Sequence, residues 1–513
     1  FPRALSTWPI VYAGLGTWTL FWTLVAISLP RSRGLPSFWL APIVVVVLCS
    51  FKNDNHALDV LPPTAAAAPT PFPTHVDHWL TTHCPSKPQP CTVRFIAAHG
   101  GGQRAAYWTQ AVLVALHDRE RNPPDFDHTV FAFSGVSGGS LGGLSYYLAR
   151  QSGPGDWRKN LHSAVSVDNL SPMIAAMMYR GVLQAFIPVP VSTFDRARWY
   201  ERGVEDAWND AFTGSTGPSM SAVFPPRSPD TPAIFLNSTV VESGKRFVNA
   251  SVLPPPTFLS DAVYVGAFQP FVASPIRNST AAHLSSRFSY SNPHATLLYQ
   301  DGQRWGRVVD GGYNEGTGLL TLLEVVDAFR EAAHCKTCGS VRIEITYIAN
   351  DPAAEDHLDG TPAQDQAAQP GQGCSGPPSP TPTPSPSPTP KPVSKPFLWE
   401  LNTPMTGTIN AHFTALTSAL RNRVLLYKEL PPDSKIPPVS FRVISLKRLI
   451  DDYTAGALGK PHEPWCEKYA SWQPALGWWL SEHSVDQMDL LLGARDAKDR
   501  SLIDLIQSRS ASR

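Results

Sequence analysis

Two stretches of the chain repeat one pattern, in which a short apolar strand leads through a glycine-rich turn into a helix. Residues 92–98 are followed by three glycines and by apolar residues at helical spacing over residues 105–119. Residues 129–133 are followed by Gly-Val-Ser-Gly-Gly and a further helical pattern. Strands that alternate with helices favour a mostly parallel sheet covered by helices. The sequence therefore predicts an α/β fold.

Later segments extend this alternation to the C-terminal part of the chain. Strands are predicted at residues 233–236, 308–309, 341–349 and 439–445, and helices at residues 319–333 and 410–430. We predict a catalytic core over residues 91–354, and we expect residues 396–513 to complete the same domain. A separate small domain is the alternative, because a proline-rich spacer precedes these residues.

Two segments have the composition of irregular chain. Residues 355–395 are polar and then alternate proline with Ser and Thr, which disfavours helix and sheet and predicts a disordered insertion. Residues 53–90 contain an alanine run followed by Pro69, Pro71 and Pro73. We expect this second segment to be a stalk or linker, with folded structure beginning near Cys91.

The first 52 residues carry two apolar stretches, at about 8–29 and 35–51, that approach the length needed to span a membrane. We predict a membrane anchor of two helices, with a signal peptide or a buried core helix as the alternatives. Arg31 and Arg33 lie between the stretches, and the positive-inside bias would place this loop in the cytoplasm. The catalytic domain would then face the periplasmic or extracytoplasmic side.

The charge and cysteine content limit the classes of function. The chain of 513 residues has 42 basic and 42 acidic residues, so no net charge favours nucleic acid as a partner. Cys49 lies in the second apolar stretch and is expected to be a free, buried thiol. The other six cysteines permit disulfides outside the cytoplasm, but the sequence selects no pairing. Cys335 and Cys338 lack a second ligand pair at zinc-site spacing, so no metal site is predicted.

The most specific motif is Gly135-Val-Ser137-Gly-Gly139, a G-x-S-x-G between a predicted strand and a predicted helix. A turn this tight needs glycines around the serine, and it presents the hydroxyl at the N-terminus of the helix. Ser137 is therefore the candidate nucleophile, with Gly135 and Gly139 forming the nucleophile elbow. The alternative interpretation, a serine in a glycine-rich turn, leaves the flanking strand and helix unexplained.

Two further motifs supply what a serine nucleophile needs. Gly100, Gly101 and Gly102 lie between a strand and a helix, where backbone N–H groups converge on an anion, as an oxyanion hole requires. Asp310 ends an apolar strand and is followed by two glycines. Considered alone, an aspartate beside glycine is more often a turn residue.

The order of the three motifs resembles that of the patatin-like and cytosolic phospholipase A2 family of lipid acyl hydrolases. The resemblance extends from Phe95 to Leu320 and includes the segments Leu236-Asn-Ser-Thr-Val and Ser286-Arg-Phe-Ser-Tyr. It implies a patatin-like three-layer sandwich with a mostly parallel central sheet, placed after the membrane anchor. Ala105 stands where patatins proper usually have glycine, which favours the phospholipase branch.

The resemblance implies a catalytic dyad without histidine. Ser137 would attack an ester carbonyl while Asp310 takes its proton, and the glycine loop would hold the oxyanion. Arg104 matches the family arginine after the glycines and would either support the loop or bind a lipid phosphate. The expected partners are a lipid or phospholipid as substrate and a membrane, with no cofactor, and the sequence identifies no protein partner.

The motifs also allow two other interpretations. His99-Gly-Gly-Gly102 is also similar to the oxyanion motif of α/β-hydrolase esterases, which need a catalytic histidine after the serine; His334 and His483 come late enough in the chain. The chain would otherwise be a membrane-tethered binding or scaffold protein with an inactive hydrolase-like domain. Loss of Ser137 or Asp310 would favour that last interpretation, and both residues are present.

Overall fold

The computed structural model describes residues 2–28, 37–62, 69–84, 91–120, 125–153, 155–225, 231–255, 262–264, 275–288, 292–299, 301–333, 341–350, 374, 416–427, 439–456, 461, 463–469, 474 and 480–493. Its helices are α1 (Pro2–Leu5), α2 (Thr7–Ser28), α3 (Ser37–Ser50), α4 (Phe72–His83), α5 (Gly102–Arg119), α6 (Phe126–Thr129), α7 (Gly138–Arg150), α8 (Trp157–Val165), α9 (Leu170–Ala176), the π-helix η2 (Met177–Gly181), α10 (Val182–Ala185), the 3-10 helices η3 (Ser192–Phe194) and η4 (Gly311–Tyr313), α11 (Arg196–Ala211), α12 (Asn278–Ser285), α13 (Leu319–Ala333), α15 (Leu446–Thr454), α16 (Glu463–Lys468) and α17 (Glu482–Gly493), with a further helix at residues 416–427. Its strands are β1 (Thr70–Pro71), β2 (Cys91–Ala98), β3 (Val130–Val136), β4 (Ala233–Val240), β5 (Arg246–Ala250), β6 (Val252–Leu253), β7 (Ala262–Tyr264), β8 (Ala295–Leu298), β9 (Arg304–Asp310), β10 (Val341–Ala349) and β11 (Val439–Ser445).

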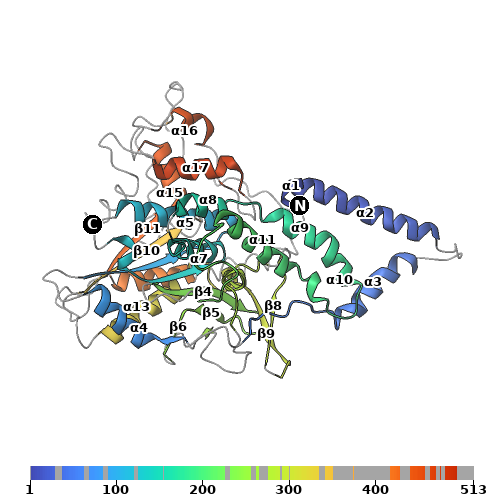
Figure 1. Ribbon diagram of the computed structural model, residues 1–513, viewed down its shortest axis with the longest axis horizontal. Helices are drawn as coiled ribbons and strands as arrows, with labels where there is room; N and C mark the ends of the chain where they lie inside the picture. The colour runs from blue at the N-terminus through green and yellow to red at the C-terminus, as the bar shows by residue number, and fades with distance from the viewer. Residues whose placement is uncertain are drawn as a thin grey trace, which may run out of the picture.

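A mainly parallel sheet forms the centre of the molecule (Figure 1). Its strands follow the order β11-β10-β2-β3-β4-β5-β7, β9 joins it along β4, and β8 pairs with β9. The strands from β11 to β4 are all parallel, whereas β4 pairs antiparallel with both β5 and β9. The predicted mixed α/β fold with a mainly parallel sheet is confirmed.

Helices cover both faces of this sheet. In β2, Ile96 and Ala98 enter a core shared with α5, α7, α8, α11 and α17, while Phe95 and Ala97 enter a second core shared with α4 and α13. Figure 1 shows α5, α7 and α8 on one side of the strands and α4 and α13 on the other. A strand buried on both faces has apolar residues in succession rather than in alternation, as in the run from Phe95 to Ala98.

The predicted stalk at residues 53–90 is wrong over the part that the structure describes. Helix α4 lies within it, and Phe72, Val76 and Trp79 are buried in the second core. Pro73 occupies the first turn of this helix, where the missing N–H would have no partner in any case. The prolines thus begin a helix, and folded structure starts well before Cys91.

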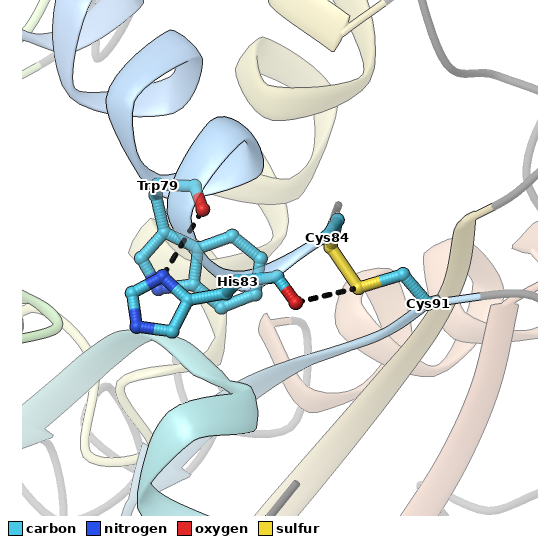
Figure 2. Close-up of a disulfide and its surroundings, with 4 residues drawn as sticks. All are labelled: Trp79, His83, Cys84 and Cys91. Atoms are coloured by element: carbon cyan, nitrogen blue, oxygen red, sulfur yellow. Dashed lines mark hydrogen bonds between the residues drawn. A yellow bond between two sulfur atoms is a disulfide. The ribbon is translucent and has the colours of Figure 1, made fainter. Parts of the chain in front are cut away.

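Two disulfides lie within the described part of the chain. Cys84 is bonded to Cys91 and Cys374 to Cys466, while Cys49 is a buried free thiol, as predicted. Figure 2 shows Cys84–Cys91 joining the end of α4 to the first residue of β2, beside the stacked rings of His83 and Trp79. Cys335, Cys338 and the proline tract at residues 377–390 lie outside the described residues.

Both N-terminal apolar stretches are helical, but they differ in length. α2 has 22 residues, and among the described residues it is the one helix long and apolar enough to cross a membrane. α3 has 14 residues with Pro42 inside, which is short of the roughly 20 needed. The structure thus offers one helix of spanning length where two are predicted, and the loop with Arg31 and Arg33, which was used to predict orientation, lies outside the described residues.

Candidate active site

Ser137 occupies a strained turn between β3 and α7. Its φ of 52° lies in the left-handed region, which only one other non-glycine residue, Ser6, adopts in the described chain. A β-carbon at Gly135 would lie 2.8 Å from the Ser140 backbone, and one at Gly139 would lie 2.6 Å from the His99 carbonyl oxygen. The turn therefore has room only for the predicted glycines, and it holds the Ser137 side chain at the start of α7.

The ends of two strands bring Ser137 and Asp310 together. β3 runs parallel to β4 and ends opposite Asn237. β9 approaches from the other direction and pairs with β4 from Val240 back to Ser238, which lies opposite Asp310. Since β5 occupies the opposite edge of β4 at these residues, β3 and β9 share one edge and meet end to end. The Ser137 hydroxyl donates to Asp310 Oδ2 at 2.7 Å.

The Asp310 carboxylate is buried, and burial shifts its protonation. The residue is 3% exposed, and its Oδ1 accepts the Gly312 N–H at 2.8 Å. Burial raises the pKa of Asp310 to about 6, although the hydrogen bonds from Gly312 and Ser137 oppose that rise. The carboxylate is thus mostly ionised at neutral pH and basic enough to accept a proton from the serine.

The glycine loop borders Ser137, but its three residues differ in what they can donate. A β-carbon at Gly100 would lie 3.2 Å from that of Ser137, so the loop closely approaches the candidate nucleophile. The Gly100 N–H donates to the Gly316 carbonyl at 2.8 Å, which removes it from the predicted oxyanion donors. Gly101 and Gly102 have φ values of 139° and 59°, and both stay candidates for that role.

Arg104 is connected to this loop through Asn350. Its Nε donates to Asn350 Oδ1 at 2.9 Å, and its Nη1 donates to the Pro474 carbonyl at 2.9 Å. Asn350, which follows β10, in turn donates to the Gly100 carbonyl at 2.6 Å. Of the two predicted roles for Arg104, these contacts favour loop support over phosphate binding.

Two residues that the sequence analysis did not name hold the elbow in place. Ser285, at the end of α12, accepts the Ser137 N–H at 2.9 Å and donates to the Asn237 carbonyl. The Asn237 side chain donates to the Gly135 carbonyl at 2.8 Å. Both residues lie in or beside the segments 236–240 and 286–290 that carry the family resemblance. That resemblance was the one feature of the sequence that pointed to them.

A buried carboxylate, that of Glu315, holds the loop whose Gly316 carbonyl accepts the Gly100 N–H. Glu315 Oε2 accepts the N–H groups of Thr317 and Gly318 at 2.8 and 3.0 Å. This fixes the turn whose Gly316 carbonyl accepts the Gly100 N–H. Burial raises the pKa of Glu315, against these hydrogen bonds.

The candidate histidines do not join the site within the described residues. His483 lies in α17, where its Nε2 contacts the Lys468 carbonyl at 3.0 Å, and His334 lies outside the described residues. The direct bond between Ser137 and Asp310 leaves no histidine between them. The described residues also contain no group of three or more His, Cys, Asp or Glu side chains placed to hold a metal ion.

Two exposed aromatic rings lie next to Asp310. Tyr313 follows the two glycines after Asp310 and stacks on Phe288, with ring centroids 6.2 Å apart. Phe288 follows Arg287, whose carbonyl accepts the Asp310 N–H at 3.0 Å. Tyr313 and Phe288 are 43% and 54% exposed, and they form an apolar surface beside the buried Ser137–Asp310 pair.

Comparison with known proteins leaves the family open. No family model matches the chain, and no curated protein sequence matches it. Among solved structures, VipD from Legionella pneumophila is 9% identical with a TM-score of 0.23, covering 52% of this chain and 51% of its own. Human GIVD cytosolic phospholipase A2 in complex with methyl gamma-linolenyl fluorophosphonate is 13% identical with a TM-score of 0.26, covering 54% of this chain and 44% of its own. The chain thus spans about half the length of these structures.

Proposed function

We propose that the protein is a serine acyl hydrolase that cleaves carboxylic esters of lipids through Ser137 and Asp310. The observation that carries the proposal is the 2.7 Å hydrogen bond from the Ser137 hydroxyl, on a strained strand-to-helix turn, to a buried carboxylate. A nucleophile hydrogen-bonded to a base is the arrangement that activates serine. The raised pKa of Asp310 supports the role of base.

The reaction would proceed in two steps. Ser137 Oγ attacks the ester carbonyl carbon while its proton passes to Asp310 Oδ2, and the N–H groups of Gly101 and Gly102 stabilise the oxyanion. Asp310 then gives that proton to the departing alcohol, which leaves an acyl-serine. In the second step Asp310 takes a proton from water as the water attacks the acyl-serine, and the proton returns to Ser137 when the acid is released.

A lipid substrate is favoured by the apolar surroundings of the site. The exposed rings of Phe288 and Tyr313 lie beside Asp310. The apolar helix α2 would hold the domain at a membrane, where lipid esters are present at high effective concentration.

The test is hydrolysis of a short-chain p-nitrophenyl ester and of phosphatidylcholine by the detergent-solubilised full chain. We expect Ser137→Ala and Asp310→Asn to lower kcat/KM by about 10³-fold or more, with His334→Ala and His483→Ala retaining activity. A histidine variant as inactive as Ser137→Ala would replace the dyad with a triad. Failure of the folded wild type to react with a fluorophosphonate would instead indicate an inactive scaffold.

A further inference from the structure

Exposed apolar side chains gather at one end of the molecule. Most of the large apolar side chains that are exposed in the described chain belong to the first 51 residues, among them Trp8 (69%), Ile27 (75%) and Leu48 (63%). Leu183 at 44% and Val189 at 58% continue this surface from another part of the sequence. A contiguous surface of this kind indicates a contact with a membrane or another protein.

Leu183 of this apolar surface belongs to a helical segment that we call the arm, residues 170–185, which is formed by α9, η2 and α10. The arm runs alongside α2 in the same direction, as Figure 1 shows for its first part. Thr7 contacts Ser171 through their hydroxyls at 3.0 Å, the Trp18 indole donates to the Met178 carbonyl at 2.6 Å, and Trp22 packs on Phe186 with ring centroids 5.9 Å apart. Successive positions of α2 therefore meet successive positions of the arm and the residue that follows it.

From this pairing we infer that the arm lies in the apolar layer of a phospholipid bilayer together with α2. The inference rests on the proposed anchoring by α2, and on neither catalytic residue. A helix packed lengthwise against a membrane-embedded helix lies at the same depth over the shared length. Sixteen residues of helix extend about 24 Å, close to the thickness of the hydrocarbon core of about 30 Å.

The charge pattern of the arm fits this environment. Arg180 is the only charged residue between positions 170 and 187. Its Nη1 donates to the Thr193 carbonyl at 2.9 Å, and its guanidinium lies 3.8 Å from the centroid of the Trp199 ring, which also contacts Arg202. The single charge of the arm thus has a backbone carbonyl and an aromatic ring as partners, as charged side chains within membranes commonly have.

The base of the arm is attached to the candidate active site. Asn169, just before α9, donates to Gln103 Oε1 at 3.3 Å, and the Gln103 side chain also donates to the Val165 carbonyl. Gln103 directly follows Gly102 of the glycine loop. A bilayer around the arm would therefore begin close to the loop that faces Ser137, which would shorten the path of a membrane lipid to the nucleophile.

The test places the photo-cross-linking residue p-benzoylphenylalanine at single positions of the full chain. Leu183 in the arm, Leu24 in α2 and the exposed Leu426 of the 416–427 helix are compared, all in a Ser137→Ala background so that no lipid is consumed. The proteins are reconstituted in phosphatidylcholine–phosphatidylglycerol vesicles with an alkyne-tagged phospholipid, irradiated, and assayed for lipid adduct. We expect positions 24 and 183 to give at least about fivefold more adduct than position 426.

The α2 position separates the possible failures. Adduct at position 24 without adduct at position 183 would overturn the inference and leave the anchoring by α2 intact. Adduct at neither position would overturn both, and cross-linking of position 183 to a second copy of the chain would assign the arm to a protein interface. Because Ser137→Ala is used throughout, loss of the proposed hydrolase activity would change none of these outcomes.

Discussion

The candidate active site and the N-terminal apolar surface differ in how their residues are held. Ser137 and Asp310 are 7% and 3% exposed and are hydrogen-bonded to each other. The Ser137 N–H also donates to the Ser285 hydroxyl, and Asp310 accepts the Gly312 N–H. In α2, by contrast, only Ile10 and Gly14 are buried, and the other side chains are exposed or half-buried. Function in the first region depends on the geometry of a few atoms, and in the second on apolar area summed over many side chains.

This difference predicts a large response to a small substitution in the first region and a small response in the second. A buried polar site has little room to adjust, so one added methyl group or one lost hydrogen bond changes its geometry. An exposed apolar surface tolerates such changes, because each side chain contributes a small share of the total.

Outside the Ser137–Asp310 pair, the largest expected effect is that of Gly138→Ala. A β-carbon at Gly138 would lie 1.8 Å from the Gly102 carbonyl oxygen, and both are backbone positions that pack α7 against α5. We expect at least about a hundredfold slower labelling by a fluorophosphonate and a destabilisation of about 3 kcal/mol or more. Gly16→Ala is the matched control, since a β-carbon there meets nothing within 4 Å. Equal labelling rates for the two variants would remove the distinction between the regions.

Ser285→Ala comes next in size. It removes the acceptor of the Ser137 N–H and the donor to the Asn237 carbonyl without touching the reacting atoms. We expect kcat to fall about 10- to 100-fold with KM little changed, and Ser285→Thr to restore part of the loss. Ser243→Ala, at an exposed serine, serves as the control. A rise in KM at constant kcat would contradict a positioning role for Ser285.

The pH dependence should show a smaller effect. In the proposed mechanism Asp310 must be ionised to accept the serine proton, and its pKa is about 6. We therefore expect kcat/KM for a short-chain ester to be about tenfold lower at pH 5 than at pH 8. A profile that is flat between these values would exclude Asp310 as the base.

Stability should change with pH in the opposite sense to activity. Because the pKa of Asp310 is raised from 3.8 to about 6 on folding, the folded protein holds the proton more tightly than the unfolded chain. Its contribution to stability is full below pH 4 and is lost as the pH rises through 6. Asp310→Asn should therefore exceed the wild type in Tm at pH 8, and the difference should shrink towards pH 4.

The local elements of this fold were predictable because their patterns are local. The helix at residues 319–333 and the strands at 341–349 and 439–445 match α13, β10 and β11 to the residue. Ser137 was found because its turn needs glycines on both sides within five residues. The prolines near residue 71 did not predict helix α4, because proline is common both in linkers and in the first turn of a helix.

The contacts that complete the site were not predictable, because they join distant parts of the chain. Ser137 and Asp310 are 173 residues apart, and they meet only because β3 and β9 share one edge of β4. Ser285 and Asn350 are common polar residues with no motif of their own, and their roles follow from the backbone groups they face. The hydrogen bond from the Gly100 N–H to the Gly316 carbonyl likewise depends on packing between separate loops.

The smallest expected effect is that of a single change on the apolar surface. Leu183→Ala removes one partly exposed side chain from a surface that also includes the exposed residues of α2 and α3. We expect Leu183→Ala to change the hydrolysis of phospholipid in vesicles by less than about twofold. The double variant Leu183→Glu/Val189→Glu should lower it at least about fivefold relative to hydrolysis of a short-chain ester, because charged side chains are costly in the apolar layer. Leu426→Glu, far from this surface along the sequence, is the control. If Leu183→Ala alone lowered vesicle hydrolysis as strongly as Ser285→Ala, Leu183 would act as a specific substrate contact, and the contrast between a directed site and a summed surface would fail.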